Sequence, residues 1–234
     1  MYGTQRTGVR LVLTNTTDPT SVDEYSAWYD EYGEALLRIG LLVNDFRFEN
    51  TLATGDQADP RFAAVYDIAT PDPATAWPDT EASSDYPRDL FGDPRSALVT
   101  PVLRGSYALV GTQERPGEHG PITGIHLVLS DGADDTSRQQ WEHGLLNAGP
   151  LYAAARFRLI DGAPDPASWL EIFETDDPQP QDAFARALTA TGAENPAPTV
   201  RRQGSFRLVA QHARAHSSHP TRPKPPDPST QDLS

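Results

Sequence analysis

An internal repeat limits the folds open to this chain of 234 residues, because five landmarks occur in the same order in both halves. Each half opens with an apolar, strand-like run and continues into a helix with a tryptophan in its first turns. A short strand with a central arginine follows, then a strand that ends in an aromatic residue and a carboxylate, and then a closing Gly-Ser-aromatic strand. The paired segments are residues 9–13 and 125–129, Trp28 and Trp141, 46–48 and 157–159, 62–67 and 169–174, and 104–110 and 203–209.

The order strand, helix, strand, strand, helix, strand is that of a ferredoxin-like βαββαβ unit, which carries helices on one face of its sheet only. A second copy of the unit is the natural cover for the bare face. We therefore predict an α+β fold in which two ferredoxin-like repeats, residues 8–113 and 122–212, form one fused, pseudo-dimeric barrel. Residues 214–234 contain five prolines and one large aliphatic residue, which predicts a disordered tail.

Helix signals are clear at three of the four expected positions. Ser21 or Asp23 is expected to cap the first helix and Gly40 to end it, and Asp134 or Asp135 to cap its second-half equivalent. Residues 181–188 predict the last helix, and residues 86–98, although interrupted by Gly92 and Pro94, are the expected first-half equivalent.

Composition excludes several classes of function. The chain has no cysteine, so no disulfide, thiolate metal site or cysteine nucleophile is expected. Its 19 Lys and Arg against 33 Asp and Glu give a formal charge of −14, which opposes binding to nucleic acid. The N-terminus lacks the apolar core of a signal peptide and no run is long enough to span a membrane, so we expect a cytoplasmic protein. We expect a monomer or weak homo-oligomer that acts on a small molecule.

The pattern Tyr25-x-x-Trp28-Tyr29-Asp30-Glu31, with the closing Gly-Ser-Tyr/Phe-x-Leu-Val, resembles signatures of dimeric α+β barrel proteins, especially the EthD-like branch. The resemblance covers about residues 8–111 and 123–211. It implies a ligand pocket between one sheet face and the flanking helices. Members include cofactor-free monooxygenases, polyketide cyclases, muconolactone isomerases and haem proteins. EthD-like sequences usually have a histidine about five residues after the tryptophan, where this chain has Gly33 and Leu146.

Two polar residues on apolar strands are candidate catalytic groups. His126 alternates with Ile125 and Leu127, and Arg158 lies between Phe157 and Leu159. In one interpretation both line a polar cavity, where His126 acts as acid or base near neutral pH and Arg158 holds an enolate or carboxylate oxygen. In the other, such residues lie at the sheet rim or pair with Asp67, Glu171 or Glu174.

Aromatic residues form the second candidate set, because rings with hydroxyl groups suit flat, hydroxylated ligands. Tyr29 is a candidate catalytic residue. The candidate substrate-binding residues are Trp28, Tyr25, Tyr66, Arg47, Trp141 and His143. The alternative is that these aromatic residues belong to the core. Because the matching second-half positions include Arg138 and Glu142, any site is expected in one half only.

We expect neither a metal nor another cofactor, because the sequence has no phosphate-binding glycine loop and no metal-ligand spacing. A haem would need an axial histidine, and only His126 and His143 lie within elements of the second half. The leading hypothesis is a cofactor-independent cyclase, isomerase or monooxygenase of bacterial secondary metabolism, acting on an apolar oxygenated, polyketide or aromatic substrate. The alternatives are a non-catalytic binding protein and a structural barrel. A buried polar side chain without an internal partner would favour catalysis, and a barrel filled by side chains would favour the structural alternative.

Overall fold

A computed structural model of the protein describes residues 6–51, 60–132, 134–163, 166–192, 194–196 and 199–213. The predicted tail, 214–234, lies outside these ranges. The first part of the chain comprises β1 (Gly8–Thr16), α1 (Val22–Ile39), β2 (Leu42–Asn50), β3 (Phe62–Ile68), α2 (Pro73–Ala82) and β4 (Val99–Glu114). The second part comprises β5 (Gly124–Asp131), α3 (Asp135–Ala148), β6 (Leu151–Ala163), β7 (Trp169–Thr175), α4 (Pro180–Thr191) and β8 (Thr199–Ala213). Both parts have the order β-α-β-β-α-β.

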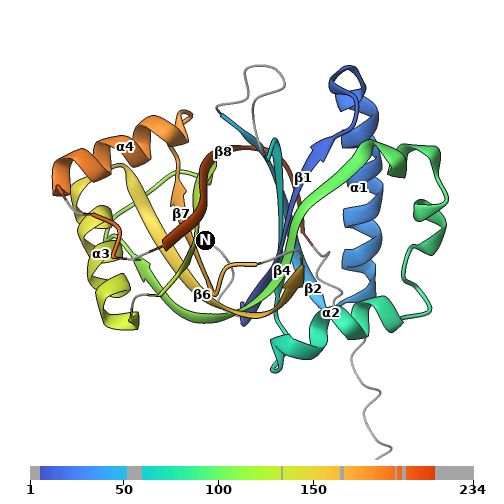
Figure 1. The fold of residues 1–234 in the computed structure, drawn as a ribbon, viewed down its shortest axis with the longest axis horizontal. Helices are drawn as coiled ribbons and strands as arrows, with labels where there is room; N and C mark the ends of the chain where they lie inside the picture. The colour runs from blue at the N-terminus through green and yellow to red at the C-terminus, as the bar shows by residue number, and fades with distance from the viewer. Residues whose placement is uncertain are drawn as a thin grey trace, which may run out of the picture.

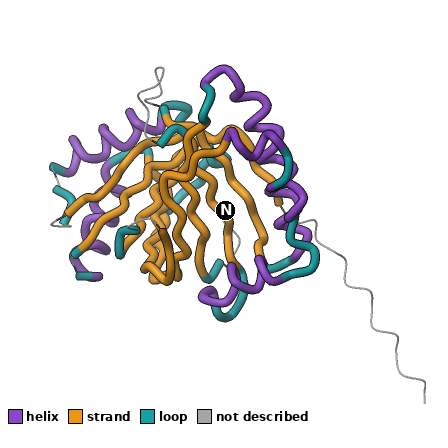
Figure 2. Tube along the Cα trace, turned by 45° about the vertical axis from the view of Figure 1, so that its right-hand side comes forward, coloured by secondary structure: helices purple, strands orange, loops and turns teal. Residues whose placement is uncertain are grey.

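The eight described strands close into one barrel in the order β1-β3-β2-β8-β5-β7-β6-β4. Each part contributes four adjacent strands, and the pairs β2–β8 and β4–β6 join the two parts. Every neighbouring pair is antiparallel. The helices lie outside the barrel, with α1 and α2 on one side and α3 and α4 on the other (Figures 1 and 2).

Apolar side chains fill the barrel interior. One buried cluster takes residues from all eight strands, including Leu11, Phe48, Leu127 and Phe157. Two further clusters lie between the outer faces of the strands and the helices, one under α1 and α2 and one under α3 and α4. Because side chains alternate between the two faces of a strand, the space open to a ligand lies between sheet and helices rather than inside the barrel.

Most of the predicted helix ends are confirmed. Helix α1 begins after Ser21, whose side chain makes no capping hydrogen bond, and ends at Gly40 in the left-handed conformation (φ 91°). Asp134 caps α3 by accepting a hydrogen bond from the Ser137 amide. The prediction of a helix over residues 86–98 was wrong, because the helix α2 lies earlier, at Pro73–Ala82. Residues 88–91 and 94–98 form two short 3₁₀ turns instead. None of the described helices is long and apolar enough to cross a membrane.

Strand pairing corrects the expected match between the two second strands. Arg47 of β2 lies opposite Ala64 of β3, while Arg156 of β6 lies opposite Glu171, which holds the position of Ala64 in β7. The structural equivalent of Arg47 is therefore Arg156 and not Arg158. The sequence match was displaced by two residues because β6 has an arginine on each side of Phe157.

Candidate functional site

A row of five polar residues crosses the outer face of the sheet beneath α1 and α2. Ser106 of β4 lies opposite Arg10 of β1, and Arg10 lies opposite Tyr66 of β3. Tyr66 lies opposite Asp45 of β2, and Asp45 lies opposite His212 of β8. Because neighbouring strands are about 4.8 Å apart, the sheet brings together residues that are distant in the sequence. We call this set the polar row.

Asp45 is the most unusual member of the polar row. The residue is 0% exposed, and neither carboxylate oxygen has a hydrogen-bond partner among the described residues. Burial raises the pKa of Asp45 to about 7, against the opposing influence of Arg47 and His212. A buried carboxyl group whose pKa is close to neutral is suited to accept and release a proton.

Gly33 of α1 explains how the carboxylate fits under the helix. A Cβ atom at position 33 would overlap Oδ2 of Asp45. The helix backbone therefore covers the carboxylate directly, at the position where the EthD-like pattern has a histidine. A glycine is required here by the close approach and not by its backbone angles.

Two tyrosine side chains, Tyr29 and Tyr66, are close enough to Asp45 to feel its charge. The Tyr25 and Thr14 hydroxyl oxygens are 2.6 Å apart, and Tyr29 hydrogen-bonds to both residues. Burial raises the pKa of Tyr29 to about 12, and the nearby Asp45 contributes. The hydroxyl of the fully buried Tyr66 has no partner among the described residues. Tyr66 can therefore donate a hydrogen bond to a ligand without losing one within the protein.

The other predicted residues of the first half hold α1 in place. Arg47 forms an ion pair with Asp30 (2.7 Å) and donates to the Ser26 carbonyl (2.9 Å), both on α1. Trp28 stacks on Tyr32 and donates from its ring nitrogen to the Leu90 carbonyl. A hollow of about 10 Å³ lies between α1 and β2–β3, lined in part by Tyr25, Tyr29, Arg47 and Ala64. Such a hollow has room for about one water molecule.

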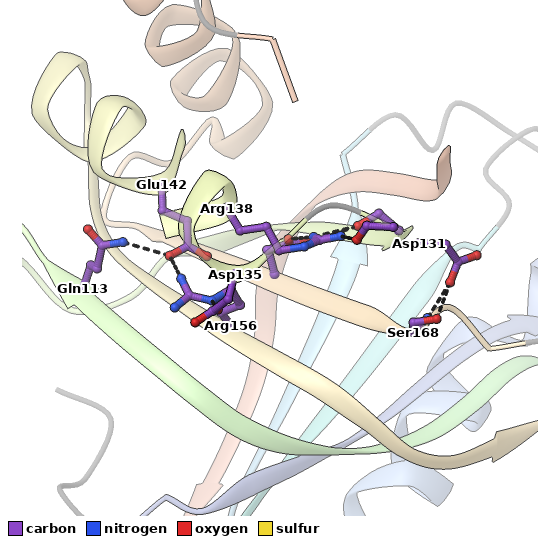
Figure 3. Close-up of polar contacts among 10 residues, drawn as sticks. Gln113, Asp131, Asp135, Arg138, Glu142, Arg156 and Ser168 are labelled. Atoms are coloured by element: carbon purple, nitrogen blue, oxygen red, sulfur yellow. Dashed lines mark hydrogen bonds and ion pairs between the residues drawn. The ribbon is translucent and has the colours of Figure 1, made fainter. Parts of the chain in front are cut away.

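In the second half, ion pairs fill the equivalent space (Figure 3). Arg138 and Glu171, both 0% exposed, form an ion pair, and Arg138 also donates to Ser130 (2.9 Å). Arg138 and Ser130 match Tyr25 and Thr14 in the first half, and Glu171 occupies the position of Ala64. Glu171 thus fills in the second half the space that Ala64 leaves open in the first.

A second ion-pair group completes this network. Arg156 pairs with Glu142 and with Asp135 (2.6 Å), and Gln113 donates to Glu142 (2.9 Å). Burial raises the pKa of Glu142 to about 7. Because these groups are engaged with one another, we assign them to the packing of α3 on the sheet. The first half is therefore the candidate location of a ligand site.

The structure does not bring His126 and Arg158 together. His126 lies opposite Phe173 on β7, whereas Arg158 lies opposite Trp169, four residues further along the same strand. His126 stacks on Phe184 (ring centroids 3.5 Å apart), and its Nδ1 is 2.7 Å from the Ser205 hydroxyl. Burial lowers the pKa of His126 to about 3, so the ring stays neutral at pH 7 and does not titrate near neutrality as expected.

Three further predicted residues of the second half lie apart from the polar row. Arg158 is exposed, with its guanidinium 5.8 Å from the centre of the Trp169 ring. Trp141 is buried against Phe173 and Phe184 in the core under α3 and α4. His143 is exposed on α3, where Nε2 contacts the Asn147 amide at 2.8 Å. Catalytic or binding roles for these residues remain predictions.

Asp45 was not among the residues predicted from the sequence. Alternation along β2 would have placed Asp45 on the same outer face as Arg47, opposite Phe46 and Phe48. Alternation predicts which face of the strand carries the Asp45 side chain. It does not predict that the carboxylate lacks a hydrogen-bond partner, because that depends on the elements packed against β2.

Two more buried carboxylates lie at one end of the barrel. Asp67 and Glu174 occupy equivalent positions at the ends of β3 and β7, and Arg6 pairs with Asp67 (3.4 Å). Asn44 also donates to Asp67 (2.9 Å). Burial raises the pKa of Glu174 to about 8. The expected pairing of Arg158 with Asp67, Glu171 or Glu174 is absent among the described residues, and Arg6 and Arg138 pair with Asp67 and Glu171 instead.

No family model and no curated protein sequence matches this chain. Among solved structures, a proposed monooxygenase from Fusobacterium nucleatum is 8% identical, with a TM-score of 0.58 over 91% of this chain and 96% of that one. A chlorite dismutase variant from Candidatus Nitrospira defluvii is 9% identical, with a TM-score of 0.56 over 89% and 93%. An anthrone oxidase-like protein is 10% identical, with a TM-score of 0.52 over 89% and 94%. These likenesses show that the chain shares its fold, the closed barrel with outer helices described above, with these proteins.

Proposed function

We propose that the chain is a cofactor-independent, monooxygenase-type enzyme whose site is the polar row beneath α1 and α2. The observation that carries the proposal is Asp45, a fully buried carboxylate without a hydrogen-bond partner among the described residues. Keeping such a group costs stability, and its pKa of about 7 suits a general base. Solved structures of the same fold that are named as a proposed monooxygenase and as anthrone oxidase-like support this reaction type.

The proposed reaction oxidises an activated CH₂ group beside an aromatic ring, in the sum R₂CH₂ + O₂ → R₂C=O + H₂O. Asp45 removes a proton from the CH₂ carbon, and the Tyr66 hydroxyl donates a hydrogen bond to the enolate oxygen that forms. The carbanion passes its electrons to O₂, and protonation gives the hydroperoxide R₂CH–OOH. A second proton leaves the same carbon as the O–O bond breaks, and the departing hydroxide takes up a proton to give water.

The small hollow beside Tyr29 and Arg47 is not lined by Asp45 or Tyr66, so a substrate must displace parts of the protein to reach the polar row. The segment that follows α2 passes along the outer side of α1 (Figure 1). It is held there by the hydrogen bond from Trp28 to Leu90 and by the Tyr32–Tyr86 hydroxyl contact of 3.1 Å. Because the backbone of α1 covers Asp45, we propose that α1 and this segment move outward together when substrate enters.

The test is oxygen uptake with anthrone-type substrates by wild-type protein, Asp45→Asn and the control Asp79→Asn, which changes an exposed residue of α2. Loss of a general base lowers turnover about 10²–10⁴-fold, so we expect that loss for Asp45→Asn alone. Because Asp45 must be ionised, wild-type turnover should rise with pH through about 7. Label from ¹⁸O₂ should appear in the ketone. Full activity of Asp45→Asn would exclude this base.

The alternative is a non-catalytic barrel. The apolar side chains that fill the barrel interior favour it. In that case Asp45→Asn would change the stability of the protein, and no tested substrate would increase oxygen uptake.

We also propose that the two halves are copies of one ancestral unit. The same contacts occur at equivalent positions, as in Tyr25 with Thr14 and Arg138 with Ser130. A protein of residues 8–113 alone should then form a dimer, and a monomer of that fragment with native circular dichroism would contradict the proposal.

A further inference from the structure

Arg10, in the polar row, is a buried cation that has no carboxylate partner among the described residues. The residue is 7% exposed, and its guanidinium lies 4.5 Å from the centre of the Trp77 ring. Nη1 donates to the Ser106 hydroxyl (3.0 Å), whereas Nε has no partner among the described residues. Glu81, the carboxylate with the largest influence on the pKa of Arg10, uses an oxygen to accept from the Trp77 ring nitrogen (2.8 Å).

The other buried arginines among the described residues, two on the sheet and one on α3, all have carboxylate partners. Arg47 pairs with Asp30, Arg138 with Glu171, and Arg156 with Glu142 and Asp135. A buried charge is stable in a protein when it is paired, and leaving it unpaired is costly. Burial and the neighbouring Arg104 both lower the pKa of Arg10, which reflects this missing counter-charge.

The second half shows that the packing at this position does not need a charge. His126 occupies the position of Arg10, stacks on Phe184 as Arg10 stacks on Trp77, and contacts Ser205 as Arg10 contacts Ser106. His126 is neutral at pH 7, because burial lowers its pKa to about 3. The structure thus holds a neutral and a charged version of one arrangement, and only the first half keeps the cation.

We propose that Arg10 binds the carboxylate of a substrate or ligand through its Nε/Nη2 edge. That edge of the guanidinium matches the two oxygens of a carboxylate, and one cation neutralises one such group. Arg104, which lies opposite Val12 on the same sheet face, adds positive potential. The role of Arg10 in turnover rests on the proposed function and restricts the substrate to an aromatic carboxylic acid. The binding of the anion does not depend on catalysis.

Calorimetric titration of the full chain with benzoate and with its neutral isostere benzamide at pH 8 tests the proposal. Wild-type protein should bind benzoate and not benzamide. Arg10→His, which copies the second half, should weaken benzoate binding at least about tenfold, as expected for loss of a charge-assisted contact. The control Arg38→His, at an exposed position of α1, should bind as wild type does.

A second readout separates ligand binding from a structural role. Because Arg10→Met removes an unpaired buried charge, its thermal midpoint without ligand should equal or exceed that of wild type. A marked decrease for both Arg10→Met and Arg10→His would overturn the proposal, as would benzoate binding that is absent from wild type or unchanged in Arg10→His. Asp45→Asn should still bind benzoate. Benzoate binding therefore tests the anion site separately from the proposed role of Asp45 as a base.

Discussion

Replacing Asp45 by asparagine should change how the stability of the protein depends on pH. An unfolded chain releases this proton near pH 3.8, whereas the folded protein keeps it up to about pH 7. The unfolded state therefore binds fewer protons between these values, and the free energy of unfolding falls as pH rises through the window. The difference between the folded and unfolded pKa values corresponds to about 4 kcal/mol of stability, at about 1.4 kcal/mol per pKa unit. About 3 kcal/mol of this is lost between pH 5 and pH 8.

Asparagine has no proton to lose, so this cost should disappear from the variant. Its unpaired amide adds a penalty of about 1–3 kcal/mol that does not vary with pH. Glu142 and Glu174, whose pKa values burial also raises, act equally in both proteins and cancel in the difference. The stability of Asp45→Asn relative to wild type should therefore increase by about 3 kcal/mol from pH 5 to pH 8, whatever the constant penalty.

Urea unfolding followed by circular dichroism at pH 5, 6, 7 and 8 measures this difference. In thermal scans the same change corresponds to a relative shift of about 6–12 °C. The control Asp79→Asn, an exposed change on α2, should follow the wild-type curve. A difference between Asp45→Asn and wild type that is constant from pH 5 to pH 8 would refute the assignment of a buried, unpartnered carboxyl group.

Three further predictions concern packing and titration. Glu171→Gln leaves Arg138 buried without a counter-charge and should lower the free energy of unfolding by about 3–5 kcal/mol. The double variant Arg138→Met with Glu171→Leu should recover most of this loss. Equal losses for the single and the double variant in urea denaturation would contradict the buried ion pair. Gly33→Ala should destabilise the protein, because the new methyl group overlaps with Asp45. The loss of stability should be smaller when Asp45 is also replaced by alanine. If the two substitutions lower the thermal midpoint additively, the contact between positions 33 and 45 is contradicted. The ring signals of His126 in NMR spectra should stay constant from pH 8 to pH 5, because its pKa is about 3; a transition near pH 6.5 would exclude the buried, neutral ring.

The strands could be predicted from the sequence because each landmark is local. Alternating apolar residues around Leu11 and Leu127 mark β1 and β5 without reference to the rest of the chain. The match of Arg47 to Arg158 failed because two arginines flank Phe157, and only the pairing with β7 distinguishes them. Helix α2 was hidden by Pro78, which breaks its hydrogen-bond pattern in the sequence.

The candidate site could be predicted only in part. Tyr25, Tyr29 and Tyr66 were identified by residue type, since aromatic rings with hydroxyl groups suit flat, hydroxylated ligands. Asp45 and Arg10 were not, because their importance lies in the absence of a partner, and that depends on every neighbouring element. The network of Arg138 and Arg156 likewise depends on strand register rather than on any spacing along the chain.

The closed ring of strands also determines how copies of this chain can associate. Each described strand has hydrogen-bonded neighbours on both sides, so its backbone amides and carbonyls are already engaged across the sheet. Another polypeptide therefore cannot extend the barrel by adding a strand, as it could on an open sheet. Any larger assembly must rely on side-chain contacts made by the helices and connecting loops, and substitutions there would alter assembly while the barrel itself stays intact.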